Sequence, residues 1–137
     1  MRIISGDLKG KTIAFLKSSV TRPLKDSVKE NIFNILKHSN LLTVNLKNSN
    51  ILDLYSGIGS FGLECISRGA KQVTFVEKDK NAFSILNENL INLNIEERST
   101  IIKENIEFFL KEGLFEKFEI IFLDPPFSDN SYLGILK

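Results

Sequence analysis

From about residue 50 onward, short apolar runs alternate with longer segments whose apolar residues recur at helical spacing. The apolar runs predict strands at 51–54, 72–76, 100–102 and 119–123. The segments between them predict helices over 61–66, 79–93 and 106–111. Strands that are apolar throughout are buried on both faces, and strand–helix alternation joins parallel neighbours. We therefore expect an α/β fold with a mostly parallel sheet and helices on both faces.

The first part of the chain follows a different pattern. Two β-prone runs, 2–5 and 11–14, flank glycines and predict a small hairpin. Apolar residues then recur at helical spacing over 26–38, which predicts a helix, and an Asn-rich stretch without pattern follows. We therefore divide the chain into an N-terminal hairpin and helix, 1–40, and an α/β part, 50–137.

Basic residues concentrate at the start of the chain. Residues 1–30 hold seven Lys or Arg against three Asp or Glu, whereas the remainder holds eleven against fourteen. Such an asymmetry suits an arm that contacts nucleic-acid phosphates beside a part that does chemistry. On charge alone, a solvated basic surface explains the same numbers equally well.

Other features indicate the cellular location of the chain and whether it binds a metal. No stretch approaches the roughly 20 consecutive apolar residues of a membrane span, and the first residues lack the pattern of a secretory signal. The single Cys65 cannot form an internal disulfide, and without a His or Cys cluster no metal site is expected. We therefore expect a cytoplasmic protein without membrane contact or bound metal.

The first of two motifs lies where the strand at 51–54 turns into a helix. It reads Asp53-Leu-Tyr-Ser-Gly57-Ile-Gly59, and Glu77 closes the next strand. Glycines at such a bend allow a close approach of the backbone to a ligand, and the helix start offers unpaired N–H groups. A carboxylate at the end of the second strand can accept hydrogen bonds from both hydroxyls of a ribose. The motif predicts a nucleotide-like cofactor, and a glycine turn that binds nothing is the weaker alternative.

Two cofactors fit this motif. In the NAD pattern the first glycine follows the strand almost directly and faces a pyrophosphate. Here Asp53 stands four residues ahead of Gly57. Its charge would repel a pyrophosphate but attract the ammonium group of a methionine tail. The spacing therefore favours S-adenosylmethionine over NAD.

The second motif, Asp124-Pro125-Pro126-Phe127, follows the strand at 119–123. That strand delivers Asp124 to the carboxyl edge of the sheet, where open α/β folds bind ligands. The exocyclic amine of a base is a poor nucleophile, and hydrogen bonds to the Asp124 carboxylate and the Pro125 carbonyl would orient its lone pair. Phe127 would stack on the base. The motif predicts methylation of such an amine, and a Pro-Pro turn that only ends a strand is the weaker alternative.

Together the two motifs resemble those of amino-methyltransferases, and the N-terminal residues narrow the resemblance. Met1-Arg-Ile-Ile-Ser-Gly, Thr21-Arg22-Pro23 and Phe33-Asn-Ile-Leu36 are similar to the RsmD-like family, bacterial enzymes that methylate guanine N2 in small-subunit ribosomal RNA. The resemblance covers residues 1 to about 130. It implies a Rossmann-like methyltransferase fold, S-adenosyl-L-methionine as cofactor, and ribosomal RNA or the small ribosomal subunit as partner.

The resemblance also implies which residues form the site. The cofactor would be held by Asp53, Tyr55, Gly57, Gly59, Glu77, Lys78, Asn105 and Ile106. Asn105 stands where the family often has an Asp that accepts a hydrogen bond from adenine, and it can equally cap the following helix. Catalysis would fall to Asp124, Pro125, Pro126 and Phe127, while Arg22, Lys25 and Phe127 would contact the RNA.

The chain departs from the family pattern near its end. The family has a seven-stranded sheet, so about three strands are expected to be missing after Lys137. The strand at 119–123 would then expose an unpaired edge and apolar surface. The sequence therefore predicts a fragment, a poorly stable chain, or self-association through that edge. Leu24 also replaces the Thr that usually follows Arg-Pro.

Other activities share parts of this pattern. Adenine-N6 DNA methyltransferases use a similar Asp-Pro-Pro-aromatic motif, although this chain shows no target-recognition domain. Protein glutamine methyltransferases usually have Asn in place of Asp124. An inactive RNA- or ribosome-binding module that keeps the basic arm is the alternative from outside the enzymes.

Overall fold

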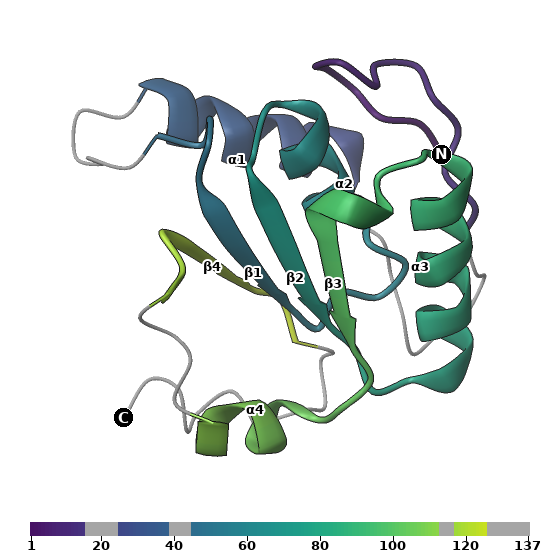
Figure 1. Ribbon diagram of the computed structural model, residues 1–137. Helices are drawn as coiled ribbons and strands as arrows, with labels where there is room; N and C mark the ends of the chain where they lie inside the picture. Colours follow the sequence, from purple (N-terminus) through teal and green to yellow (C-terminus); the bar gives the residue numbers. More distant parts are fainter. Residues whose placement is uncertain (16–24, 39–44, 113–116, 126–137) are drawn as a thin grey trace.

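The computed structural model describes residues 1–15, 25–38, 45–112 and 117–125, and its centre is a four-stranded parallel sheet (Figure 1). The strands are β1 (Asn50–Leu54), β2 (Gln72–Val76), β3 (Ser99–Ile102) and β4 (Ile120–Leu123), in the order β3-β2-β1-β4. The helices are α1 (Asp26–His38), α2 (Ser60–Ser67), α3 (Lys80–Asn92) and α4 (Ile106–Glu112), with a short 3-10 turn, η1 (Glu96–Arg98), before β3. The predicted α/β fold is confirmed, and the strands and helices match their expected bounds to within one residue.

β1 occupies the position in the sheet where the strand order reverses. It pairs with β2 from Asn50↔Gln72 to Leu54↔Val76 on one side. On the other side it pairs with β4 from Ile51↔Ile120 to Leu54↔Leu123. Open parallel sheets bind ligands outside the carboxyl ends of the strands at such a switch point. The carboxyl ends of β1 and β4 are therefore the expected ligand site.

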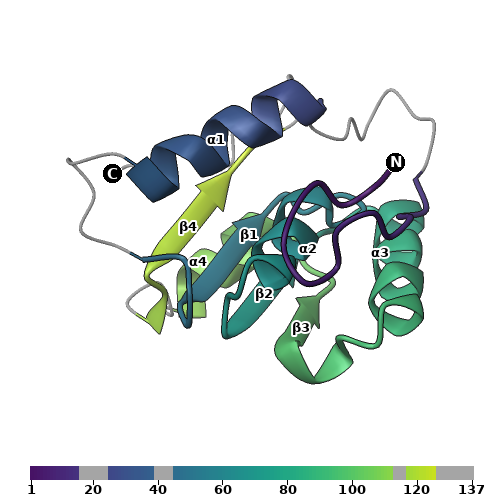
Figure 2. The same ribbon diagram turned by 90° about the horizontal axis from the view of Figure 1, so that it is seen from above.

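Alternate strand residues enter two separate hydrophobic cores. The first core contains Ile51, Val73 and Phe75 together with side chains of α1, α2 and α3. The second contains Leu52, Leu54 and Val76 together with Ile106 and Phe109 of α4. Burial of each such side chain contributes about 1.5–3 kcal/mol. Helices therefore cover both faces, with α1 toward the β4 side and α3 toward the β3 side (Figures 1 and 2).

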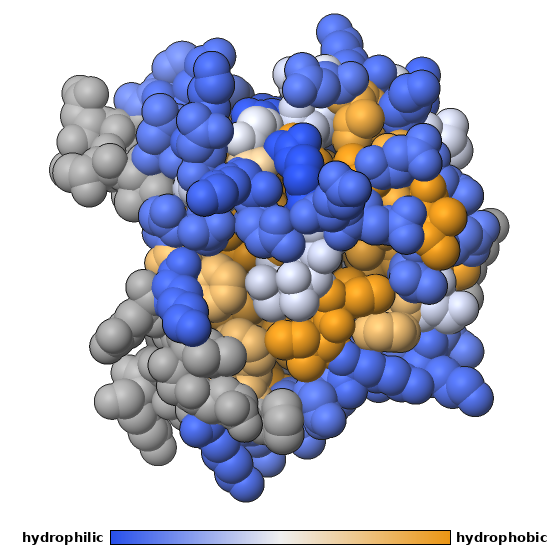
Figure 3. All heavy atoms as spheres, viewed as in Figure 1, coloured by the Kyte–Doolittle hydropathy of each residue, from blue (hydrophilic) through white to orange (hydrophobic). Residues whose placement is uncertain are grey.

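α4 covers its face of the sheet only in part. Tyr55, Ile102, Phe118 and Leu123 are partly buried at the margin of the second core. Figure 3 shows apolar surface, in orange, at the centre of the view above α4.

The N-terminal arm, residues 1–15, forms an antiparallel bridge between Arg2 and Thr12 instead of two regular strands. Its pairing is nevertheless that of the predicted hairpin, because the N–H of Ile3 donates to the Lys11 carbonyl at 3.0 Å. Ile3 and Ile13 are buried in the first core, so the arm packs on the α/β part. The division of the chain into 1–40 and 50–137 stays a prediction.

A buried charged network fixes the arm and α1 on α2. The Glu64 carboxylate accepts hydrogen bonds from the backbone N–H of Ile4 (2.9 Å), the backbone N–H of Ser5 (3.0 Å) and Arg68 Nε (2.9 Å). Lys29 of α1 is also fully buried, and its Nζ lies 3.5 Å from Glu64 Oε1. Burying a charge without partners is costly, so these groups stabilise each other only while all the segments are in place.

Candidate active site

The chain bends sharply after β1. Tyr55, Gly57 and Gly59 have positive φ angles of 57°, 58° and 95°. Two of the three are glycines, but Tyr55 adopts this left-handed conformation at a cost of about 1–2 kcal/mol. The N–H of Ser56 donates to the Val76 carbonyl at 3.0 Å, which ties the bend to β2. A Cβ built on Gly57 would meet no described residue within 4 Å, so the described part of the chain leaves the space beside the bend open to a ligand.

Asp53 lies in β1 beneath this bend and is 1% exposed. Its Oδ2 accepts a hydrogen bond at 3.2 Å from the N–H of Gly62 in the first turn of α2, whose N-cap residue is a glycine. Burial raises the pKa of Asp53 well above its usual value. The Gly62 hydrogen bond lowers that pKa, and the charges of Asp124 and Glu77 raise it further. Three carboxyl groups therefore converge here, which favours a positively charged ligand.

Glu77 follows β2 directly and holds the bend from the second strand. Its Oε1 accepts from the N–H of Gly57 at 2.8 Å, and its Oε2 accepts from the N–H of Asp79 at 2.8 Å. A carboxylate offers about four acceptor positions. Glu77 can thus hold the bend through Oε1 and Asp79 through Oε2, and each oxygen can still accept a further hydrogen bond from a hydroxyl.

Asp124 and Pro125 follow β4 at the same edge. Because Leu54 pairs with Leu123, Tyr55 and Asp124 leave neighbouring parallel strands side by side. Asp124 is exposed, yet partial loss of its surrounding water raises its pKa from the usual value. Its charge also acts on Asp53. The glycine bend and the Asp-Pro corner therefore lie at one site.

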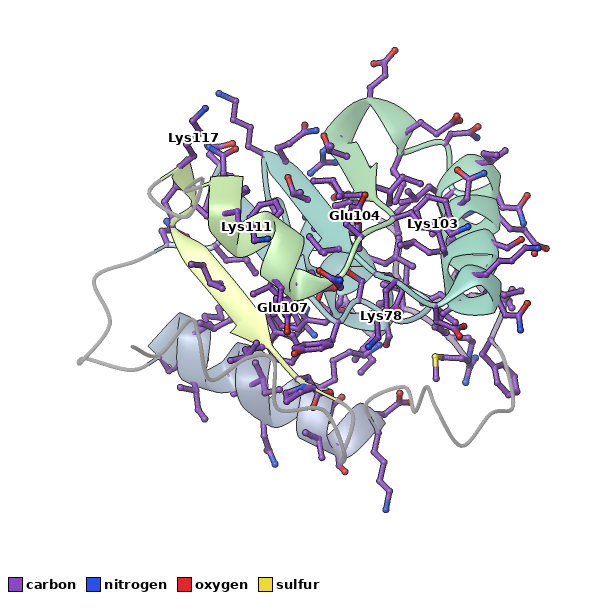
Figure 4. The ribbon with its side chains drawn as sticks, turned by 90° about the horizontal axis from the view of Figure 1, so that it is seen from below. Lys78, Lys103, Glu104, Glu107, Lys111 and Lys117 are labelled. Atoms are coloured by element: carbon purple, nitrogen blue, oxygen red, sulfur yellow. The ribbon has the colours of Figure 1, made fainter. Side chains whose placement is uncertain are left out.

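The other predicted cofactor residues lie around this edge. Lys78 and Asn105 are exposed and follow β2 and β3, respectively. Ile106 begins α4 and is buried in the second core, with 3% of its surface exposed. Figure 4 shows charged side chains of both signs at this edge, among them Lys78, Lys103, Glu104 and Glu107. Contact of Lys78, Asn105 and Ile106 with a cofactor stays a prediction.

The residues predicted to meet RNA are described only in part. Lys25 is exposed and directly precedes α1, and its carbonyl accepts from the N–H of Lys29 at 3.0 Å. Arg22, Pro126 and Phe127 lie outside the described residues.

Two features of the site were not anticipated from the sequence. Phe122 of β4 stacks on Phe61 of α2, with ring centroids 3.8 Å apart, so aromatic packing joins the helix after the bend to the strand before Asp124. Asn89 of α3 donates to the carbonyl of Ile58, inside the bend, at 3.1 Å. The sequence could have indicated the second feature. Asn89 recurs at helical spacing with Ala82, Leu86 and Leu90, and a polar side chain in such a buried stripe needs hydrogen-bond partners.

Neither a metal centre nor a membrane span is found in the described part of the chain. Within it, no group of three or more His, Cys, Asp or Glu side chains could hold a metal ion. None of the helices in those same ranges is long and apolar enough to cross a membrane. Burial raises the pKa of the Cys65 thiol well above its usual value, which keeps the sulfur protonated and unreactive.

Comparisons with known proteins give a consistent result. Residues 1–136 match the family model described as conserved hypothetical protein 95. The chain is 39% identical to the ribosomal RNA small subunit methyltransferase D of Haemophilus influenzae, over 95% of this chain and 65% of that protein. It is 32% identical to the protein YlbH of Bacillus subtilis, over 99% of this chain and 72% of that protein.

Solved structures show the same similarity. The yhhF protein of Escherichia coli superimposes with a TM-score of 0.74 at 30% identity, covering 93% of this chain and 64% of that one. A hypothetical protein of Thermus thermophilus gives a TM-score of 0.80 at 25% identity, covering 99% and 77%. The chain spans 65% and 62% of the lengths of the methyltransferases D of Haemophilus influenzae and Buchnera aphidicola.

Proposed function

Because the chain belongs to the RsmD-like family, that of conserved hypothetical protein 95, we propose that it methylates the exocyclic N2 amine of a guanine in small-subunit ribosomal RNA, with S-adenosylmethionine as donor. The observation that carries this proposal is the pairing of β1 with β4, which brings the glycine bend and Asp124 to one edge. Relatives named as ribosomal RNA small subunit methyltransferases support the substrate class. Such a substrate also implies a cytoplasmic location.

The residues at the bend fit S-adenosylmethionine. The carboxyl groups of Asp53, Glu77 and Asp124 converge, and this cofactor carries positive charge on its ammonium and sulfonium groups. The space beside Gly57 is open, and the spare acceptor positions of Glu77 suit the ribose hydroxyls. The Asn105 side-chain oxygen would accept a hydrogen bond from the adenine of the cofactor. NAD would bring a pyrophosphate toward the same carboxylates, so it fits less well.

The chain's own groups would prepare the amine for attack. S-adenosylmethionine, when bound, supplies an electrophilic methyl carbon. The Asp124 carboxylate and the Pro125 carbonyl would accept the two N–H groups of the amine and so direct its lone pair toward that carbon. As the C–N bond forms and the donor's C–S bond breaks, positive charge develops on the nitrogen, and the Asp124 carboxylate would stabilise it until the nitrogen loses one proton. Phe127 would hold the ring flat, and Arg22 and Lys25 would contact RNA phosphates.

Cofactor binding and methyl transfer are tested separately. Calorimetric titration of the full chain should show saturable binding of S-adenosylmethionine and none of NAD. Tritiated methyl groups should then pass to small-subunit particles or their RNA and not to DNA, and nucleoside analysis should show N2-methylguanosine. N6-methyladenine in DNA would favour the alternative enzyme. Binding of RNA without any transfer would favour an inactive module.

Asp124→Ala separates chemistry from binding in the same assays. We expect methyl transfer to be abolished while the dissociation constant for S-adenosylmethionine stays within about tenfold of the wild-type value, because the lost contact is made to the reacting amine. Transfer at the wild-type rate by this variant would refute the assigned role of Asp124.

We also propose that the chain self-associates through β4. Among the described strands β4 and β3 are the two outer ones, so one side of the β4 backbone has no partner in that part of the chain. Ile121 of this strand is 39% exposed. Unpaired strand edges with apolar side chains favour pairing with a second copy.

A further inference from the structure

Asn89 of α3 joins two parts of the molecule that lie far apart in the sequence. Its side chain is 2% exposed. Its Oδ1 accepts from the N–H of Ala14 at 2.8 Å, and its Nδ2 donates to the Ala14 carbonyl at 3.0 Å and to the Ile58 carbonyl at 3.1 Å. A single amide thus contacts both the end of the N-terminal arm and the middle of the glycine bend.

At the bend, Asn89 binds the carbonyl of Ile58, which the hydrogen bonds made by Gly57 and Gly59 do not involve. Ile58 lies between Gly57 and Gly59, both with left-handed backbone conformation. The N–H of Gly57 donates to Glu77, and the N–H of Gly59 donates to the Ser56 carbonyl at 2.9 Å. A glycine-rich backbone has many accessible conformations. The buried hydrogen bond from Asn89 to the Ile58 carbonyl therefore favours the one conformation in which it can form.

At the arm, Asn89 binds both backbone groups of one residue. The pair of hydrogen bonds with Ala14 resembles one rung of a β-ladder, formed by a side chain in place of a strand. Arg22, which the proposed function assigns to RNA, follows eight residues later. Asn89 therefore holds both Ala14, after which the chain continues toward Arg22, and Ile58 in the bend.

We propose that Asn89 is a positioning residue that joins the cofactor bend to the end of the N-terminal arm, from which the chain continues to Arg22, so that binding of cofactor or RNA strengthens binding of the other. This inference rests on the proposed function for the identity of the two ligands. Coupling of this kind is reciprocal, so RNA should tighten S-adenosylmethionine binding by the same factor as the cofactor tightens RNA binding.

Asn89→Asp is the sharpest test, with Asn87→Asp as its matched control. The aspartate at 89 keeps an oxygen for the Ala14 N–H but removes both donors and faces two carbonyl oxygens. Asn87 lies on the same helix and is exposed, so the same chemical change there alters only surface charge. We expect Asn89→Asp to raise the dissociation constant for S-adenosylmethionine about tenfold. Asn87→Asp should leave it within about twofold.

Two further measurements separate positioning from a general loss of stability. Hydrogen exchange of the unliganded full chain should become faster in Asn89→Asp at residues 55–62 and 1–15, and not across β1 and β2. With a small-subunit RNA fragment present, wild type should bind S-adenosylmethionine several-fold more tightly, and this gain should vanish in Asn89→Asp. Unchanged exchange at the bend, or an equal RNA effect in both proteins, would overturn the inference.

A second variant covers the case in which Asn89→Asp does not fold. Ala14→Pro removes the N–H that donates to Asn89 Oδ1 and places the proline ring there, so it loosens the arm from Asn89 without changing Asn89 or Ile58. Weaker S-adenosylmethionine binding by this arm variant would support the coupling, and unchanged binding would refute it. If the wild-type chain binds no S-adenosylmethionine at all, the proposed function fails instead, and the exchange measurement still decides whether Asn89 orders the bend.

Discussion

Among single residues, Asp53 combines a structural cost with a proposed binding role. Its pKa is raised by burial and by neighbouring carboxylates, so the folded chain holds this proton more tightly than the unfolded chain does. As the pH rises above about 3.9, the unfolded chain ionises first, and the free energy of unfolding falls until folded Asp53 also ionises.

Asp53→Asn should therefore stabilise the fold at neutral pH. The asparagine keeps an oxygen for the Gly62 N–H and has no proton to lose. We expect the free energy of unfolding to rise at pH 7, because the unfolded wild type gains stability there by ionising Asp53 and the asparagine cannot ionise. Urea unfolding should show no gain near pH 3, where both states of the wild type are protonated. Binding of S-adenosylmethionine should weaken in the same variant, because the negative charge is gone.

Asp124 leads to a prediction about the rate of methyl transfer. In the proposed mechanism the Asp124 carboxylate must be ionised to accept from the amine, and partial desolvation raises its pKa. Single-turnover rates should therefore fall on acidification at a higher pH than the ordinary aspartate value of about 3.9 would give. Asp124→Asn should be slower by about 100-fold. An acid limb that persists unchanged in Asp124→Asn would mean that another group titrates.

The elements of the arm and α2 meet at a contact that only glycine permits. Gly6 has a φ of +89°, and a Cβ placed there would lie 2.0 Å from the Ser67 carbonyl oxygen. We expect Gly6→Ala to destabilise the chain by about 3 kcal/mol or more, from the strained backbone and the steric clash together. Gly10 is the control, because its φ is +82° but a Cβ would meet nothing within 4 Å. Gly10→Ala should cost only about 1 kcal/mol in urea unfolding.

The elements themselves could be predicted from the sequence, whereas their cross-links could not. Apolar runs and helical spacing are local patterns, so β2 and α1 were expected with the bounds that the structure shows. The contacts that Glu64 and Asn89 make to the arm join residues about 60 to 75 positions apart, and no local pattern records such partners. The motifs correctly predicted that Asp53 and Asp124 share one edge, because parallel neighbouring strands end together. That Asp53 is buried beneath the bend, bound to a helix N–H, depends on the packing of α2.

For the molecule as a whole, the outer edge of β4 makes a prediction about oligomeric state. We expect the purified chain to show a concentration-dependent increase in mass by light scattering. Ile121→Lys, which places a charge on this strand, should shift the protein toward monomer. Ile91→Lys is the control, since Ile91 is 48% exposed on α3 and away from that edge. A wild-type chain that stays monomeric at all concentrations would refute self-association through β4.

The buried Glu64 carboxylate also sets an order of events during synthesis. It accepts from the N–H groups of Ile4 and Ser5, yet it is added sixty residues after Ile4. At about 5–20 residues per second, Ile4 and Ser5 wait roughly 3–12 s after their own synthesis for this acceptor. The arm therefore cannot take its final place on α2 until Glu64 has also been added to the chain.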